Sequence, residues 1–379
     1  MNALKKTECF VKRLLCTAAL VACAHGLMAD SMNPQNPPSL MNFCTAVFLE
    51  SPDYCFEASF TGLGLQPLAN NLDYAAEAVP FNYGFGLPVL SPSWVIPEIN
   101  TDIHFGFDVG IAGTFHGANS SLMLNWERFH SSNDSGTFTV SSSSFMIGPF
   151  FEIGPDASVY KTATGQVNFH FDEVNLDYGT FVRFGNRLHL NLFAGASFAR
   201  LKQHRFTQWS NLEGTTVRTI DIPSKFTGAG PQVGVNFDYR IAEGFQFVGH
   251  TRATLFVGTF KNSTTFTTVS PILAALGDPL NVQSISVFNR TGMAPGFEGK
   301  LGLSYECWFG CYNMFKIEAG YQAQVYLNSI RSIDLGSEVA LNALGSIGSA
   351  VTGVYARSFE RTVSDFALVG PYATVYVGF

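Results

Sequence analysis

Charged residues are scarce in this chain. Asp, Glu, Lys and Arg make up 13% of the 379 residues, whereas an ordinary soluble domain has roughly 25%. Long apolar runs are also missing after the N-terminal segment, which excludes a membrane-spanning helix from the mature protein. Phe and Gly are abundant instead, with 36 of each. An apolar composition without a spanning helix is typical of a transmembrane β-barrel, whose apolar residues are spread over alternating strands.

Motifs of catalysis and ligand binding are missing too. The chain has no Gly-x-Ser-x-Gly elbow and no His-Glu-x-x-His pair, so we expect no enzyme, no metal and no cofactor. The Gly-rich run at 228–234 lies inside a strand pattern and lacks the Lys-Ser/Thr of a phosphate loop. Scattered His residues and abundant Ser leave a Ser/His pair as the alternative.

The N-terminus reads as a secretory signal over residues 1–29. Four bases precede an apolar stretch at Leu14–Ala24, and cleavage fits after Ala24 or Ala29. A lipidated Cys23 is the alternative. Removing residues 1–29 leaves 18 bases and 28 acids, a net charge of −10, which argues against a nucleic-acid partner. Residues 30–53, rich in Pro and Asn, predict a periplasmic lead-in.

Four cysteines remain after export, an even number for an oxidising compartment. The close pairs Cys44/Cys55 and Cys307/Cys311 are the candidate disulfides. Cross-links between neighbouring chains are an alternative. A metal site at the second pair is disfavoured because no His lies beside it.

The C-terminal stretch Phe366–Phe379 alternates in polarity. Val375, Val377 and Phe379 share one apolar face, and the opposite face is small or amphipathic. Such a strand suits a barrel in lipid, although an edge strand of a soluble sandwich also alternates. A terminal outward Phe resembles the signal that outer-membrane assembly machinery reads, so that machinery is a predicted partner.

The same alternation recurs along the chain and predicts an up-and-down antiparallel transmembrane β-barrel over residues 54–379, in the bacterial outer membrane. The predicted strands are Tyr54–Gln66, Thr101–Phe115, Ser120–His130, Gln166–Val182, Leu188–Phe198, Lys225–Arg240, Phe245–Phe260, Met293–Glu306, Phe315–Leu327 and Phe366–Phe379. Ten strands is the favoured number, and a hairpin hidden in 131–164 would make twelve.

Connection lengths support this architecture. The predicted connections alternate long and short from the N-terminus, as in barrels with short periplasmic turns and long extracellular loops. The long ones are 67–100, 131–164, 203–224, 261–289 and 329–362. A short apolar helix at Val339–Val351 is the candidate constriction of the barrel mouth.

Inward parity predicts a polar, net-acidic lumen. Mid-strand charges facing lipid would cost about 2–4 kcal/mol for a base, so these side chains should turn inward. The predicted lining is Asp102, His104, Asp108, Glu127, His170, Asp172, Asp238, His250, Arg252, Glu298, Lys300, Lys316, Glu318 and Gln322. An acid excess would favour cations. The alternative is a filled interior, with Glu298/Lys300 and Lys316/Glu318 as charge pairs.

One strand breaks the simple pattern. In Gln166–Val182, the outward apolar row is assigned to Val167, Phe169 and Phe171 and then to Val174, Leu176 and Tyr178. These two triplets have opposite parity, so a β-bulge is predicted at Asp172-Glu173.

Several stretches resemble the Legionella-type major outer membrane protein family. The chief one is Phe226-Thr-Gly-Ala-Gly-Pro-Gln-Val-Gly234, which is similar to the family's Phe-x-Gly-x-Gly-Pro-x-x-Gly strand. Others are Leu63-Gly-Leu-Gln-Pro67, Val174-Asn-Leu-Asp-Tyr-Gly179, Leu192-Phe-Ala-Gly195, Gly244-Phe-Gln-Phe247, Thr254-Leu-Phe-Val-Gly258 and Gly370–Phe379. The resemblance implies a pore-forming outer-membrane barrel.

The favoured function is therefore porin-like passive diffusion of small hydrophilic solutes through the lumen. The rival is a structural or adhesive surface protein with a plugged barrel and external loops that bind host surface molecules. Outer-membrane lipid and further copies of the chain, as a homo-oligomer, are the other expected partners.

Overall fold

The computed structural model describes residues 54–78, 94–115, 119–140, 145–147, 152–153, 160–185, 187–211, 213–214, 217–269, 280–286, 289–309, 313–341 and 351–379. All of them belong to one compact unit, Phe48–Phe379. The predicted signal segment and the lead-in, residues 1–53, lie outside the described residues.

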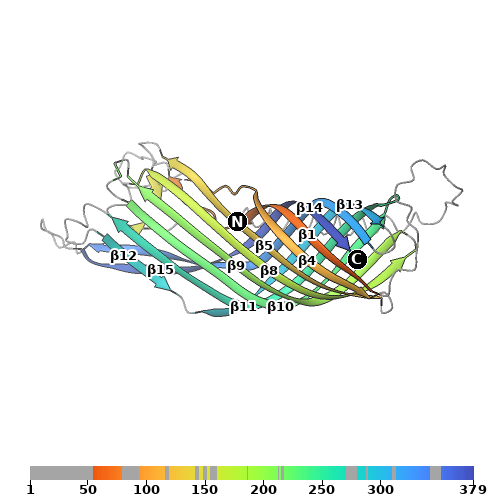
Figure 1. The fold of residues 1–379 in the computed structure, drawn as a ribbon. Coiled ribbons are helices and arrows are strands. Elements are labelled where there is room, and N and C mark those ends of the chain that lie inside the picture. The colour runs from red at the N-terminus through yellow and green to blue at the C-terminus, as the bar shows by residue number, and fades with distance from the viewer. Residues whose placement is uncertain are drawn as a thin grey trace. The chain divides into compact units, whose positions relative to one another are not determined.

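Ten antiparallel strands form a closed barrel in which each strand pairs with the strands before and after it (Figure 1). They are β1 (Tyr54–Ala69), β4 (His104–Phe115), β5 (Ser120–Thr139), β8 (Thr162–Phe184), β9 (Leu188–Ser210), β10 (Val217–Arg240), β11 (Phe245–Val269), β13 (Arg290–Phe309), β14 (Asn313–Leu341) and β15 (Val351–Gly378). The barrel closes where β1 pairs with β15, with Ala58 opposite Val377. The predicted up-and-down barrel of ten strands is confirmed.

Within the described residues, five short strands lie outside the barrel wall. β2 (Ala76–Ala78) pairs with β3 (Trp94–Val95) and β6 (Phe145–Ile147) in a small separate sheet. β7 (Glu152–Ile153) pairs with β14, and β12 (Leu280–Ser286) extends β11 as a hairpin. They all belong to the connections on one side of the barrel.

The barrel strands are longer than the sequence pattern predicts. β8 to β11 have 23 to 25 residues each, whereas a tilted strand crosses a bilayer in roughly 9–11 residues. Much of the predicted loop 203–224 is therefore strand, and only residues 211–216 connect β9 to β10. The ends of loops 131–164, 261–289 and 329–362 are strand as well.

The predicted constriction helix at Val339–Val351 is contradicted only at its two ends. Val339–Leu341 ends β14 and Val351 begins β15, both in strand conformation, and residues 342–350 lie outside the described part. Among the described residues, no helix could cross a bilayer.

The predicted bulge on β8 is also wrong. β8 pairs without a break with both neighbours through Asp172 and Glu173, and the register shift against β5 lies farther out, between Asp134 and Thr137. Val167, Phe169 and Phe171 are therefore buried inward-facing residues. The inward row of β8 changes from apolar to polar without changing side.

Apolar residues face outward along the barrel wall. The side chains of Phe105 and Ile317 are 70% and 45% exposed, while Asp108 and Gln322 are 8% and 1% exposed. Alternation along each strand places the first pair on the outer face and the second pair in the lumen. The outer wall is thus apolar, and the polar side chains gather inside.

Candidate functional site: the barrel lumen

A charged layer fills the lumen at mid-height. It consists of Asp108, Glu127, Glu173, Arg252, Glu298 and Lys300. Arg252 on β11 forms an ion pair with Glu298 and lies 3.2 Å from Glu173 Oε1. Lys300 Nζ lies 3.0 Å from Glu298 Oε1. Charge-assisted hydrogen bonds of this kind are the ones able to offset the burial of ions.

Contacts in this layer cross the lumen. Gln324 on β14 donates hydrogen bonds of 3.0 and 2.8 Å to the two carboxylate oxygens of Glu127 on β5. The Tyr326 hydroxyl on β14 donates to Glu173 on β8. Because β14 is a neighbour of neither β5 nor β8, these bonds join opposite walls.

A second polar group lies nearer the periplasmic end. Lys316 Nζ lies 3.5 Å from Asp238 and 3.8 Å from Glu318. The Tyr372 hydroxyl donates a 2.7 Å hydrogen bond to Glu318. This group continues the polar lining from the charged layer to the short turns.

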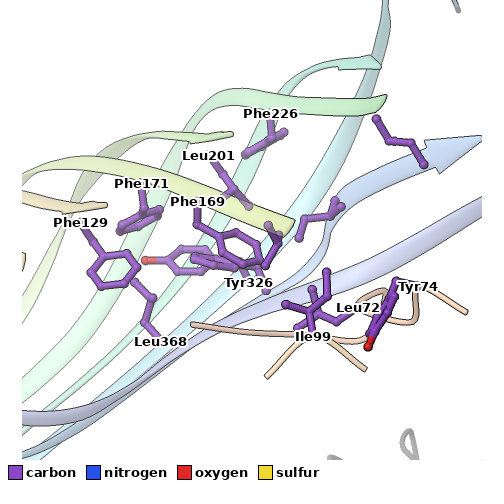
Figure 2. Packing of buried hydrophobic residues seen from close by; sticks show 14 of the residues in the cluster. Leu72, Tyr74, Ile99, Phe129, Phe169, Phe171, Leu201, Phe226, Tyr326 and Leu368 are labelled. Carbon is purple, nitrogen blue, oxygen red and sulfur yellow. The ribbon is translucent and has the colours of Figure 1, made fainter. Parts of the chain in front are cut away.

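An aromatic layer lies on the extracellular side of the charged layer. It is made of Phe129, Phe169, Phe171, Phe226, Phe256 and Phe366, all buried. Phe169 on β8 lies 5.2 Å from Phe366 on β15, between ring centroids, and Phe171 lies 5.0 Å from Tyr326. Figure 2 shows Phe169, Phe171 and Tyr326 side by side, with Phe129 and Leu368 next to them. Rings from opposite walls thus meet in the lumen.

The first long connection covers the extracellular mouth. This mouth segment comprises residues 70–75 and 98–101, and Figure 2 shows its Leu72, Tyr74 and Ile99 grouped together. Asn71 exchanges hydrogen bonds of 3.0 and 2.9 Å with Gln203 on β9, a strand far around the wall from β1. A Cβ at Gly165 would lie 2.9 Å from Ile99 and Tyr74, so this glycine lets the segment dock.

Asp73 is an acid of the mouth segment whose pKa is shifted. It forms a β-bridge with Glu98. Burial raises the pKa of Asp73, and the charge of Glu98 raises it further, while Arg205 opposes the rise. The mouth segment thus contains a carboxyl group that resists ionisation in the folded state.

An apolar outer wall around a polar lumen is typical of barrels of the outer membrane. The sequence profile of the Legionella pneumophila major outer membrane protein precursor matches residues 51–379. The chain belongs to this family. It is therefore a protein of the bacterial outer membrane, and its apolar outer wall faces lipid.

The similarity of this chain to solved structures is weaker than its match to the family. The outer membrane protease OmpT from Escherichia coli is 11% identical with a TM-score of 0.40, covering 87% of this chain and 98% of that chain. A Pseudomonas aeruginosa FadL homologue is 7% identical with a TM-score of 0.25, covering 86% and 90%. A TodX monoaromatic hydrocarbon channel mutant is 9% identical with a TM-score of 0.28, covering 86% and 91%. At these scores the likenesses carry no argument about activity. Comparison with curated proteins finds no match.

Most of the predicted lining residues of this family member lie on inward rows. These are His104, Asp108, Glu127, Asp238, His250, Arg252, Glu298, Lys300, Lys316, Glu318 and Gln322. The interior pairs include Lys300 with Glu298 and Lys316 with Glu318. The polar lining is interrupted by the aromatic layer, which the parity rule for the lumen did not anticipate.

Three predicted lining residues lie elsewhere. His170 and Asp172 share the outward row of β8, because their neighbours Phe169, Phe171 and Glu173 are buried inside. Asp102 is exposed in the connection before β4.

The lining also includes acids that the prediction missed. Glu173 and Asp177 are buried on the inward row of β8. The parity they share with Asn175, opposite Val174 and Leu176, was the signal that marks them as inward.

The terminal and cysteine features have mixed outcomes. The side chains of Val375, Val377 and Phe379 are exposed on the outer face, where an assembly signal would have to lie. Both candidate disulfides stay predictions, since Cys44, Cys311 and the Cys55 side chain lie outside the described residues.

Proposed function

We propose that this protein is a porin-like channel that admits small hydrophilic solutes, and that the aromatic layer and the mouth segment close its lumen in this conformation. The observation that carries the proposal is the order of the inward side chains. Charged and amide groups line the lumen below the aromatic layer. Above it, the polar residues Ser131, Asn133 and Gln203 lie among further buried apolar residues such as Val167 and Ile220. An apolar constriction that polar groups border on the periplasmic side and interrupt on the extracellular side is what a gated water path requires.

The proposed gate acts by dewetting. A narrow apolar constriction excludes water and ions until its side chains part. The aromatic rings belong to walls joined only by side-chain contacts, so they can separate without breaking the backbone ladder. Once open, the lumen should prefer cations, since Asp108, Glu127, Glu173, Asp177 and Glu298 outnumber the bases Arg252 and Lys300.

Single-channel recording in planar bilayers tests this proposal. Purified wild-type protein should give small, brief conductance steps, and a Phe171→Ala/Phe366→Ala variant should give steps several times larger. Leu124→Ala removes an apolar side chain from the outer wall of β5 and should leave conductance unchanged. Equal conductance in the double variant and the wild type would count against the gate.

Selectivity is read from the same bilayers under a KCl gradient. The reversal potential should indicate cation preference, and Glu127→Gln should weaken it. Anion preference in the wild type would sink the acidic-lumen part of the proposal.

The rival function is a plugged surface protein that uses its loops to bind host molecules. It is favoured by the hydrogen bonds between Gln324 and Glu127 that cross the lumen, because small barrels often fill their interior with paired polar groups. Liposome swelling separates the two. Vesicles with either wild type or the double Phe variant would stay impermeable to small sugars if the rival is right.

Assembly of the barrel is proposed to depend on the outward C-terminal signal. Phe379→Ser should reduce the amount of folded protein in the outer membrane, measured by its heat-modifiable gel mobility. Phe105→Ser changes an equally outward aromatic on β4 and serves as the control.

A further inference from the structure

Three lysines lie directly beside one another on the outer wall. Lys202 on β9 pairs in register with Lys225 on β10, and Lys225 pairs with Lys261 on β11. Figure 1 shows these three strands adjacent in the wall. We call these residues the lysine row. Like charges directly opposite each other on neighbouring strands are destabilising, so the row needs a counter-charge.

The lysine row faces outward. Lys202 lies between the buried residues Leu201 and Gln203, and Lys225 lies between the buried residues Ser224 and Phe226. Alternation along the strand therefore turns both ammonium groups away from the lumen. Lys261 follows the buried Phe260 and is itself exposed.

Other bases extend the row, and acids do not neutralise it. Arg200 precedes Lys202 on the same outward face of β9, and its rung partner is Asp172. Asp172 is already engaged by Arg128, 3.7 Å away. Asp221, farther out, contacts His204 at 2.5 Å. Within the described residues, no ion pair involves Lys202, Lys225 or Lys261.

The height of the row matches the outer surface of the bilayer. Lys202 is 14 residues from Leu188 at the periplasmic end of β9, and Lys261 is 16 residues from Phe245 on β11. Crossing a bilayer takes roughly 9–11 residues. The nearest outward apolar residues on the periplasmic side of the row, Phe198 and Val257, lie four positions from the lysines along β9 and β11. With a strand rise of about 3.4 Å per residue and a tilt of about 40°, the row lies about 10 Å above them.

We propose that the lysine row binds the phosphate groups of the phosphorylated glycolipid of the outer leaflet. The acyl chains of the lipid would lie against the apolar wall below, at Phe198, Ala229 and Val257. Ammonium groups at this height attract anionic headgroups and form charge-assisted hydrogen bonds with phosphate oxygens. The site is separate from the lumen and does not depend on whether the barrel conducts.

Native mass spectrometry of the full-length mature protein in neutral detergent tests this site. Diphosphoryl lipid A should remain bound to the wild type. Lys202→Gln/Lys225→Gln/Lys261→Gln should weaken its affinity by about tenfold or more, as expected for the loss of three charged contacts. Arg183→Gln/Arg187→Gln/Arg240→Gln removes three charges at the periplasmic turns and should bind normally. Retention of lipid A by the lysine variant at wild-type affinity would overturn the proposal, and so would an equal loss in the arginine control.

Comparing lipids on the wild type needs no variant and decides the case if the triple variant does not fold. Dephosphorylated lipid A should bind at least about tenfold more weakly than the diphosphoryl form. Inorganic phosphate alone should bind far more weakly than lipid A, because it lacks acyl chains for the apolar wall. Equal binding of the two lipids, or lipid-like affinity for inorganic phosphate, would refute a phosphorylated glycolipid as the occupant.

Discussion

The charged layer and the aromatic layer are built by the same strands, on the same inward faces. On β8, Phe169 and Phe171 belong to the aromatic layer, and Glu173, two residues on, belongs to the charged layer. Both layers are buried, and both join opposite walls. The comparison of the two layers shows that strand alternation alone decides which side chains face the lumen. Polarity decides only which layer they join.

The largest expected effect is in the charged layer. Arg252→Met leaves Glu173 and Glu298 buried without their shared cation, which should lower the free energy of unfolding by about 3–5 kcal/mol. Denaturant titration in detergent, followed by gel mobility, measures the change. Arg183→Met alters an exposed arginine at the end of β8 and should change stability little. A loss below about 1 kcal/mol would mean that water reaches and solvates the two carboxylates.

The aromatic layer should respond through packing. Phe171→Ala removes a ring that contacts Tyr326 and Phe366, and a buried Phe→Ala change costs about 3–5 kcal/mol where the cavity does not collapse. We expect the lower end, about 3 kcal/mol, because the lumen can admit water. The same titration measures it. Phe171→Leu, which keeps most of the volume, should recover more than half of the loss.

Substitutions on the outer face of β8 test how the cost of a charge facing lipid differs from that of the buried charges inside. Leu176→Arg places a base on the lipid face of β8 and should cost about 2 kcal/mol near the bilayer centre. Phe184→Arg, also outward but at the end of β8 beside the periplasmic turn, should cost less than about 1 kcal/mol. Stability in lipid vesicles is the measurement. Equal costs at both positions would contradict the placement of the lipid belt.

The smallest effect concerns the mouth segment. Because the pKa of Asp73 is raised in the folded segment, the folded form binds the proton more tightly. The segment should be most stable at acidic pH and loosen as pH rises from the ordinary pKa toward the raised one. Asp73→Asn removes the ionisable group and should abolish this loosening.

Hydrogen exchange at the Tyr74 and Ile99 amides reports on the segment, since Ile99 donates a hydrogen bond to Leu72 and Tyr74 donates one to the adjoining Pro97. Protection in the wild type should fall with pH, after correction for intrinsic exchange, and stay flat in the variant. A flat wild-type profile would show that Asp73 does not control docking.

Sequence reasoning worked wherever one face of a strand meets lipid. Lipid imposes an unbroken apolar row, so Phe105, Ile111 and Ile317 identify the outer wall, and the intervening residues must face the lumen. The same constraint predicted ten strands and the inward charges of Arg252 and Glu298. The closed circuit from β1 to β15 follows from it.

Sequence reasoning failed where lipid no longer requires an apolar row. Above the bilayer the outward face of a strand meets water, so Gln203–Ser210 and Val217–Ser224 have no continuous outward apolar row and the pattern predicts a loop, although Trp209, Ile220 and Ile222 are buried inside. Inside the barrel, Phe169 and Phe171 look like lipid-facing residues and led to a false bulge. Asn71, Tyr74 and Ile99 cover the mouth without having been predicted to, and the middle of the predicted constriction, 342–350, lies outside the described residues.

The amino-acid order by itself determined the barrel, its sidedness and its membrane, because lipid leaves a strand one tolerable pattern. Only the tertiary structure decided how the lumen is filled and which segment covers it. Those outcomes depend on contacts between strands far apart in the chain, such as Gln324 with Glu127 and Phe169 with Phe366. A repeat within one strand holds no record of which side chain faces it across the lumen.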